Sequence, residues 1–253
     1  GSGTTGNELI VSDATGWVVG DEICIFPETT YTEFDYKYIK TISGNTITTS
    51  LTSGGAESGL TYTHASGNTV INLSRTIEIT TNSDTKGMVG YIQTKNPTIN
   101  YTKLSRTGSS TTNKETFNLG RSWCYINSTG CVFDKTLGTE NGIQLAYKNV
   151  IVSTLDSAIF GRQLSASIPF ASVSLGNGII NDVICFDSSN GMLINTTSKM
   201  NFNRPKFISC GKGSATTAGY GQLRTTSGKN VVFSDGIFEF SLNSINNYNA
   251  VQK

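Results

Sequence analysis

The sequence predicts an all-β protein: a right-handed single-stranded parallel β-helix, or solenoid, preceded by an N-terminal β-rich cap. Three observations lead to this prediction. The chain contains no sustained apolar stripe with the i, i+3, i+4, i+7 spacing of a helix. Short β-branched runs recur instead, bounded by Gly, Asn, Ser and Asp. From about residue 87 onward, similar segments return at long intervals, which is typical of stacked architectures.

The composition suits many turns around a thin core. Hydrophobic residues make up 36% of the chain and charged residues 15%, with 27 Gly, 4 Pro and a net charge of +1. The balanced charge argues against a nucleic-acid-binding surface and against a charged disordered tail. No run of about 18 apolar residues occurs, so no membrane span is expected. We also expect the chain to be a fragment of a longer protein.

Five short runs predict strands in the cap, which we place at residues 1–86. They alternate with period two or form short buried runs, as strands do. They cover residues 8–11, 22–26, 45–48, 68–71 and 76–79.

The remaining residues, 87–253, are predicted to form coils. Segments 141–145, 190–194 and 220–224 resemble one another, and each precedes a second apolar run, at 150–152, 207–208 and 231–233. Partial units are 87–89 with 99–101, and 178–180 with 183–186. Gly221 lies 30 residues after Gly191, and Gly191 lies 49 residues after Gly142, which fits two coils of about 25 residues. Stacking buries the inward face that one coil leaves open. A β-sandwich with regular turns is the alternative.

Tight turns and buried thiols complete this part of the prediction. Asn-Gly pairs begin at Asn141, Asn177 and Asn190, and both residue types tolerate positive φ. Five cysteines are an odd number, and each has apolar neighbours, so we interpret them as free thiols that act as small hydrophobic residues. They include no C-x-x-C pair, so no zinc site is expected. These cysteines are Cys24, Cys124, Cys131, Cys185 and Cys210.

Residues 10–23, Ile-Val-Ser-Asp-Ala-Thr-Gly-Trp-Val-Val-Gly-Asp-Glu-Ile, resemble the opening of the eight-glycine domain of cell-surface hyaluronidases and the fibrocystin family. The likeness continues through 41–48, 60–64 and 70–79, and covers about residues 8–106. Similar Gly-Trp-x-x-Gly-Asp-Glu-Ile segments occur in phage and bacterial β-helix proteins. The resemblance implies a cap followed by β-helix coils. It does not imply hyaluronidase activity, because the hyaluronan-degrading members carry a histidine-rich segment after the first coil, and residues 107–123 contain no His.

The residues that carry this resemblance also have structural interpretations. Gly16 and Gly20 fit turns that require positive φ or close backbone approach. Trp17 is expected to fill the core of the cap. Asp21 and Glu22, at the start of a strand, are expected to accept hydrogen bonds from turn amides.

Catalytic motifs are incomplete. His64 is the single histidine, and residues 120–124 lack the last glycine of a Gly-x-Ser-x-Gly elbow, so we interpret His64 as structural. Residues 209–214 lack the spacing of a phosphate-binding loop. No metal or cofactor is expected.

Acidic residues offer the clearest catalytic candidates. Asp134, Asp156 and Asp182 lie 22 and 26 residues apart, close to one coil, so they could form a ladder of carboxylates as glycoside hydrolysis requires. Arg121 and Arg162 could bind uronic acids or assist an elimination. The alternative is that all five are isolated, solvated turn residues.

Aromatic residues are candidates for carbohydrate binding, because their rings can stack on sugars. The candidates are Trp123, Tyr125, Tyr147 and Tyr220. Each of them could instead belong to the core.

These observations lead to a ranked expectation of function. The first is a structural or attachment module of a phage virion, such as a tail or fibre, or of a microbial surface, with a glycan-binding face and an extracellular or virion-associated location. The second is a polysaccharide depolymerase, a hydrolase or lyase, and the third is a scaffold without a ligand. The expected partner is a glycan or cell-surface polysaccharide, and a homotrimer or larger virion assembly is the expected oligomer.

Overall fold

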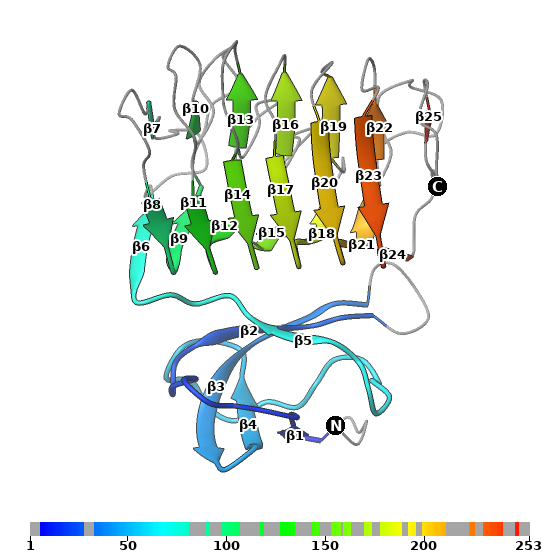
Figure 1. The fold of residues 1–253 in the computed structure, drawn as a ribbon. Helices are drawn as coiled ribbons and strands as arrows, with labels where there is room; N and C mark the ends of the chain where they lie inside the picture. Colours follow the sequence, from blue (N-terminus) through cyan, green and yellow to red (C-terminus); the bar gives the residue numbers. More distant parts are fainter. Residues whose placement is uncertain are drawn as a thin grey trace. The chain divides into compact units, whose positions relative to one another are not determined.

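The chain is built from strands. A computed structural model describes residues 6–27, 33–80, 90–91, 98–106, 117–118, 127–134, 143–146, 153–157, 159–162, 170–173, 178–188, 192–195, 199–210, 223–225, 230–239 and 246–247. None of these residues is helical, so the predicted all-β class is confirmed for them. The chain divides into two compact units, Gly1–Ser74 and Arg75–Lys253, called unit 1 and unit 2 below (Figure 1).

Unit 1 contains one five-stranded antiparallel sheet with the order β1-β4-β3-β2-β5. Four of the predicted cap strands lie here within a few residues of their expected bounds. The longest strand, β3, was not predicted. The strands are β1 (Glu8–Ile10), β2 (Glu22–Ile25), β3 (Asp35–Ser43), β4 (Thr46–Ser50) and β5 (Val70–Asn72).

One face of β3 explains why this strand escaped prediction. Its buried positions are Asp35, Lys37 and Ile39, so two of the three inward side chains are charged. Alternation of apolar and polar residues is the sequence signal of a half-buried strand. Charged residues on the buried face remove that signal.

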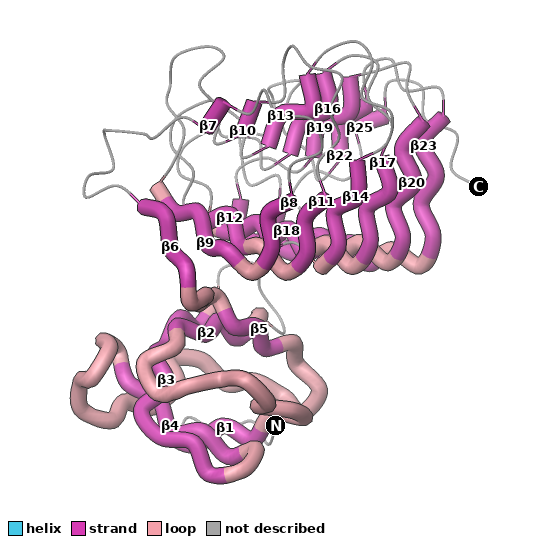
Figure 2. Tube along the Cα trace, turned by 60° about the vertical axis from the view of Figure 1, so that its left-hand side comes forward, coloured by secondary structure: helices cyan, strands magenta, loops and turns pink. Residues whose placement is uncertain are grey.

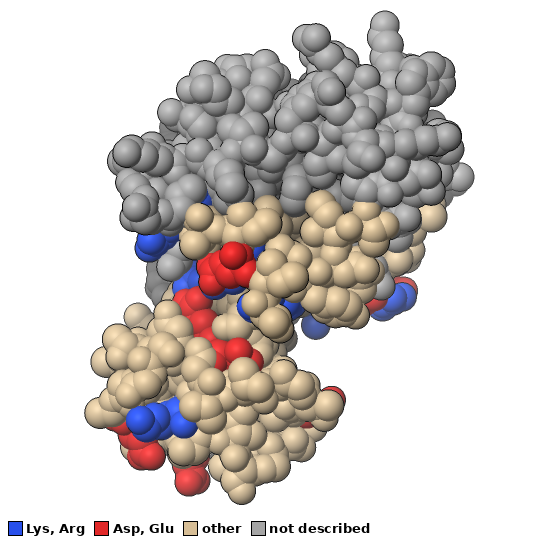
Figure 3. All heavy atoms as spheres, turned by 90° about the vertical axis from the view of Figure 1, so that its left-hand side faces the viewer, with Lys and Arg blue, Asp and Glu red and all other residues tan. Residues whose placement is uncertain are grey.

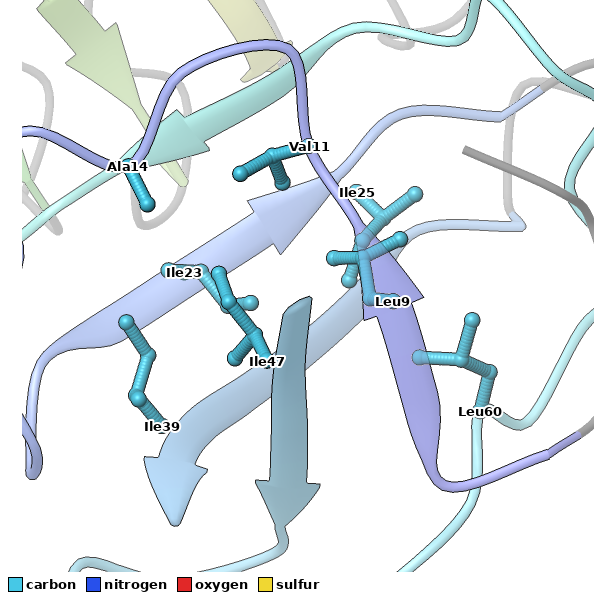
Figure 4. Packing of buried hydrophobic residues seen from close by; sticks show 8 residues of the cluster. All are labelled: Leu9, Val11, Ala14, Ile23, Ile25, Ile39, Ile47 and Leu60. Carbon is cyan, nitrogen blue, oxygen red and sulfur yellow. The ribbon is translucent and has the colours of Figure 1, made fainter. Parts of the chain in front are cut away.

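The core of unit 1 is aliphatic and lies against the sheet (Figure 4). Full burial of one such side chain contributes roughly 1.5–3 kcal/mol. Trp17 packs against this cluster, which confirms its predicted place in the cap core. Gly16 and Gly20 have φ of 79° and 94°, as their turn positions require. Eight buried residues form the cluster: Leu9, Val11, Ala14, Ile23, Ile25, Ile39, Ile47 and Leu60.

Unit 2 contains three sheets, and every strand pair in them is parallel. Sheet I has six strands: β8 (Thr98–Asn100), β11 (Asn127–Thr129), β14 (Ser153–Asp156), β17 (Gly178–Asn181), β20 (Lys199–Asn203) and β23 (Asn230–Ser234). Sheet II has seven: β6 (Ile77–Thr80), β9 (Thr102–Ser105), β12 (Val132–Asp134), β15 (Ile159–Gly161), β18 (Ile184–Ser188), β21 (Lys206–Cys210) and β24 (Ile237–Glu239). Sheet III has seven: β7 (Gly90–Tyr91), β10 (Phe117–Asn118), β13 (Ile143–Ala146), β16 (Phe170–Val173), β19 (Met192–Asn195), β22 (Leu223–Thr225) and β25 (Asn246–Asn247).

The strand order within each sheet advances by three along the sequence, so the chain visits the three sheets in turn (Figure 2). The predicted repeats at 141–145, 190–194 and 220–224 fall on β13, β19 and β22 of the same sheet, with β16 between the first two. The predicted match between runs 207–208 and 231–233 is wrong. The first belongs to β21 of sheet II and the second to β23 of sheet I, because each repeat holds three strands rather than two.

The first strand of unit 2 is β6, which pairs with β9. The predicted cap extends to residue 86, so β6 lies within the range predicted for the cap, although it pairs with a strand of unit 2. The Asn-Gly pairs at residues 141 and 190 lie outside the described residues, and of the pair at residue 177 only Gly178, the first residue of β17, is described.

The buried faces of unit 2 are lined by large apolar side chains in register. In sheet II, Leu104 neighbours Phe133, and Cys185 neighbours Phe207, and all four are buried. In sheet I, the ring of Phe202 stacks on that of Phe233 in the adjacent strand, with centroids 4.8 Å apart and planes 12° from parallel. Such columns place like side chains one strand spacing apart, about 4.8 Å.

Four cysteines are described, and all four are free and buried: Cys24, Cys131, Cys185 and Cys210. The prediction of buried free thiols is confirmed for them. Burial, with a smaller effect of the neighbouring Cys210, raises the pKa of the Cys185 thiol well above its usual value. These groups therefore act as small apolar side chains.

Candidate functional site

Polar residues occupy one position of every strand of sheet I. We call this row the polar column. Successive members occupy paired positions of neighbouring strands, so their backbones are about 4.8 Å apart. The members are Asn100, Thr129, Asp156, Asn181, Asn203 and Ser234.

The polar column faces away from the buried side of the sheet. The preceding residues Ile180 and Phe202 are buried, and successive side chains of a strand point to opposite faces. Asn100 is exposed, whereas Thr129, Asn181, Asn203 and Ser234 are half-buried. Two positions back on the same face, Ile179 and Val232 are 38% and 53% exposed. Solvent therefore reaches this face of the sheet.

Hydrogen bonds run along the column from one strand to the next. Asn203 Nδ2 donates to Asn181 Oδ1 at 2.8 Å. Ser234 Oγ donates to Asn203 Oδ1 at 2.9 Å. Near the other end, the backbone N–H of Thr129 donates to Asn100 Oδ1 at 3.1 Å. The bonds hold these side chains in a fixed orientation, so the face is pre-organised.

A two-residue corner follows the polar column in each repeat. The first corner residue always has a left-handed backbone, with φ between 48° and 63°. Only one is glycine, and a non-glycine residue held in this region costs about 1–3 kcal/mol. We call these residues the corner column: Tyr101, Gly130, Ser157, Asp182, Arg204 and Asp235.

The corners extend the hydrogen bonding of the strands. The backbone N–H of Tyr101 donates to the carbonyl of Thr129 at 2.9 Å, and that of Asp182 donates to Asn203 at 2.9 Å. Ser157 and Arg204 make the corresponding bonds to the next strand, at 3.0 and 2.7 Å. A regular backbone hydrogen bond to the next repeat therefore offsets the cost of the left-handed backbone.

An exposed ion pair joins two neighbouring corners. Arg204 donates from Nε and Nη2 to the two carboxylate oxygens of Asp182, at 2.7 and 2.6 Å. The side chains are 58% and 41% exposed. The hydrogen bonds from Arg204 lower the pKa of Asp182 against a smaller opposing effect of burial, and the charges of Arg204 and Lys206 lower it further. Asp182, a predicted catalytic candidate, is thus an ionised partner of an arginine.

Two other predicted candidates, Asp134 and Arg162, meet in sheet II. Arg162 donates from Nε to Asp134 Oδ1 at 2.8 Å and from Nη2 to Oδ2. Lys103 Nζ lies 3.9 Å from Asp134 Oδ2 and 3.7 Å from Glu78 Oε1. Figure 3 shows acidic and basic side chains lying next to each other on unit 2. Because Asp134 is 1% exposed, the arginine and lysine hold a carboxylate that solvent does not reach.

The expected ladder of Asp134, Asp156 and Asp182 is wrong. Asp134 ends β12 in sheet II, and its paired positions are Ser105 and Gly161. Asp156 ends β14 in sheet I and belongs to the polar column, whereas Asp182 belongs to the corner column. Spacing close to one repeat did not give one column, because repeats differ in length and the three residues occupy different places in them. For Asp156 the structure describes the backbone alone.

His64 lies in a buried polar network of unit 1. Its Nε2 is 2.9 Å from Asp35 Oδ2, and its Nδ1 is 3.0 Å from the carbonyl oxygen of Phe26. Asn68 Nδ2 lies 3.5 Å from the same Nδ1, so a third polar group completes the surroundings of the ring. His64 is 3% exposed. This burial agrees with its interpretation as a structural residue.

Asp35 is the centre of that network. Its carboxylate accepts hydrogen bonds from the backbone N–H groups of Thr61 and Tyr62 at 2.9 Å, and Lys37 Nζ lies 3.6 Å away. Burial alone would raise the pKa of Asp35, but the hydrogen bonds from His64, Tyr62 and Thr61 together outweigh it and hold the pKa well below its usual value. The group is ionised and satisfied by its donors.

Tyr101 was not among the predicted site residues. Its side chain is 62% exposed, and its ring lies over Gly130 of the next repeat. Residues 99–101 belong to one of the partial units that the sequence predicts. Tyr101 and Gly130 each follow a polar-column residue, Asn100 and Thr129. An alignment of the repeats at these positions would have placed Tyr101 next to Gly130.

The remaining predicted candidates fall outside the described residues: Arg121, Trp123, Tyr125, Tyr147 and Tyr220. Within the described part of the chain, no three His, Cys, Asp or Glu side chains gather as a metal site would require. The same residues include no helix with the length and hydropathy needed to cross a membrane.

No protein-family model matches the chain, and no curated protein matches it either.

Proposed function

We propose that unit 2 is a right-handed single-stranded parallel β-helix that serves as a structural or attachment module and presents a glycan-binding face. The strand order, which advances by three in each of the parallel sheets, supports the solenoid. Parallel connections within one sheet are right-handed in nearly all proteins, which supports the hand. We further propose that unit 1 is a cap of the eight-glycine type, supported by the turns at Gly16 and Gly20.

The polar column carries the functional proposal. It places amide and hydroxyl groups on a solvent-accessible face, at a pitch of about 4.8 Å. Glycans are polymers of polar groups with a regular repeat, and a pre-organised face binds them with a smaller loss of side-chain entropy. A flat row of half-buried Asn and Ser side chains therefore suits a polysaccharide better than an apolar or highly charged ligand.

Catalysis receives less support. Asp134 and Asp182 are each bound by an arginine, and Asp134 is buried. Hydrolysis needs two carboxylates across a groove, one of them able to hold a proton. Neither Asp134 nor Asp182 offers such a carboxylate. Depolymerase activity would contradict the attachment proposal.

The proposed setting is a phage virion or a microbial surface, where the molecule acts outside the cell as a homotrimer or in a larger assembly. The buried free thiols support the virion setting. A protein that folds in a reducing cytoplasm has no need of disulfides, even if it later works outside. The Ser, Thr and Asn content of the exposed face fits contact with hydrated polysaccharide.

An array of bacterial capsular polysaccharides, O-chains and host glycans tests the proposal. We expect the wild-type chain to bind at least one glycan, and the double variant Asn181→Ala/Asn203→Ala to lose that signal. Asn7→Ala is the matched control, because Asn7 is an exposed asparagine of unit 1 that also bonds another side chain. The bound glycan is then incubated with the wild-type chain and its size is measured. Shortened products would replace attachment by depolymerisation, and absence of any binding would overturn both.

A further inference from the structure

Tyr101 combines three properties. Its backbone is left-handed, with φ of 48°, although it carries a large side chain. The side chain is 62% exposed. A Cβ added to Gly130 would lie 2.7 Å from the atoms Cδ1 and Cε1 of the Tyr101 ring, so the ring covers the glycine at close contact.

Tyr101 is the one aromatic member of the corner column, and its side chain reaches solvent. The left-handed backbone is shared by the whole corner column, including the bulky Arg204, so the exposed ring and its place beside the polar column distinguish Tyr101. The corner column shows that smaller or more tolerant residues are available here, including Gly130, Ser157 and Asp182. The Cδ1–Cε1 edge of the Tyr101 ring lies against Gly130, while much of the side chain remains in solvent.

The neighbours of Tyr101 hold this arrangement in place. Its N–H donates to the carbonyl of Thr129 at 2.9 Å. Arg75 Nε donates to the carbonyl of Gly130 at 2.6 Å, which fixes the backbone beneath the ring. Asn100, the preceding residue, belongs to the polar column and is exposed. An aromatic surface and an amide therefore lie side by side.

We infer that Tyr101 is a stacking platform for a pyranose ring at the β8 end of the polar column. The negative face of an aromatic ring attracts the C–H groups on the apolar face of a sugar, and the adjacent Asn100 amide supplies hydrogen bonds to its hydroxyls. Binding sites commonly combine an aromatic surface with a few placed polar groups. This inference rests on the proposed function and names one subsite of it.

The test uses Tyr101→Gly, because glycine suits the left-handed backbone and the variant is not expected to be strained. The probe is the array polysaccharide with the strongest wild-type signal, titrated by calorimetry. We expect its affinity to fall at least about tenfold in Tyr101→Gly and to stay within about threefold in Tyr101→Phe, which keeps the ring. Ser157→Gly is the matched control, because it makes the same backbone change at another corner.

The outcomes separate the inference from the proposed function. If wild-type and Tyr101→Gly chains bind equally while the Asn181/Asn203 double variant does not, the platform is overturned and the polar column stands. If the wild-type chain binds no glycan, the proposed function is wrong, and the stacking platform, which depends on it, is wrong as well. Thermal unfolding of each variant shows whether a lost affinity reflects a lost fold. A Tyr101→Gly variant that melts at or above the wild-type temperature and binds weakly supports the platform.

Discussion

Asn203 donates its side-chain amide to the side-chain oxygen of Asn181, and Ser234 donates in turn to Asn203. The three residues belong to three neighbouring strands, so one chain of hydrogen bonds crosses three repeats. Each amide has one side that donates and one that accepts, and the column uses both. The direction of the Asn203 amide is thereby set by its two neighbours.

Replacing Asn203 by Asp should test this direction. The carboxylate still accepts from Ser234 but places a second acceptor against Asn181 Oδ1. We expect a loss of about 1–2 kcal/mol in the free energy of unfolding at pH 7, measured by urea denaturation. The loss should shrink in acid, where the new carboxyl is protonated and can donate. Asn201→Asp, on the same strand and face, is the control. Equal losses in both variants would contradict the hydrogen-bonded column.

The two aspartate–arginine pairs should differ in their effect on stability. Asp134→Asn leaves Arg162 and Lys103 beside a neutral group in a buried place, and we expect a loss of about 3 kcal/mol. Asp182→Asn removes an exposed pair, where water replaces the partner, and should cost about 1 kcal/mol or less. Urea denaturation of both variants measures the difference, and added salt should affect only the exposed pair. Similar losses would show that burial does not separate the two.

Gly130 and Tyr101 should be coupled energetically. Gly130→Ala introduces a Cβ that meets the Tyr101 ring and also forces a side chain into a backbone with φ of 63°. We expect a loss of about 2 kcal/mol in the wild-type background. In a Tyr101→Ala background the collision is absent and only the backbone cost remains, so the loss should be smaller by about 1 kcal/mol. A double-mutant cycle by urea denaturation gives the coupling, and additive losses would refute the contact.

Unit 1 should lose stability in acid through Asp35. Its pKa in the folded chain lies below the ordinary value of 3.8, so the unfolded chain binds the proton more readily. The contribution is full at neutral pH and declines as the pH falls below about 5 toward the folded-state pKa. Asp35→Asn should lower stability at pH 7 by about 2 kcal/mol and flatten the acid dependence.

Trp17 fluorescence provides the measurement for unit 1. A Trp123→Phe background leaves Trp17 as the single tryptophan, so urea unfolding at several pH values reports on this unit. Asp13→Asn is the control, because Asp13 is an exposed aspartate whose pKa is lowered by hydrogen bonds from Thr15. An unchanged acid slope in Asp35→Asn would remove Asp35 as the cause.

Thiol labelling should separate the folded from the unfolded chain. In a Cys124→Ser background, the four remaining cysteines are buried, so we expect no rapid reaction with Ellman's reagent in the folded protein. All four should react once guanidinium unfolds the chain. A fast-reacting thiol in the native variant would contradict the burial of at least one of them.

The sequence predicted the strand content better than the strand arrangement. Short runs such as 22–26 and 45–48 reveal strands because their pattern is local. β3 was missed because Asp35 and Lys37 face inward, and their burial depends on His64, Thr61 and Tyr62 far along the chain. The number of strands in each repeat was also missed, because three-residue strands carry too little pattern to separate one sheet from the next.

The candidate site was less predictable than the fold. Asp134 and Arg162 were both singled out, but their pairing depends on the register of β12 and β15, which the sequence does not state. The polar column was invisible for the same reason. Its members are ordinary Asn, Ser and Thr residues that matter only because the register aligns them. Tyr101 became a candidate only because its ring lies against Gly130, which belongs to the next repeat.

The corners after the polar column differ from the other connections of unit 2 in one respect. In every repeat, two residues lie between the polar-column residue and the sheet II position that is aligned with Val132. By contrast, β18 and β19 are separated by three residues, 189–191, and β21 and β22 by twelve, 211–222. Residues can therefore be gained or lost elsewhere without shifting the column. The polar column therefore keeps a constant spacing of about 4.8 Å between successive polar residues. A polymer whose repeat length is a multiple of this spacing can place an equivalent polar group beside the column in each of its repeats. In a polymer with another repeat length, the polar groups become misaligned with the column after a few units. The repeat length of a ligand, as much as its chemistry, would therefore decide whether this surface binds it.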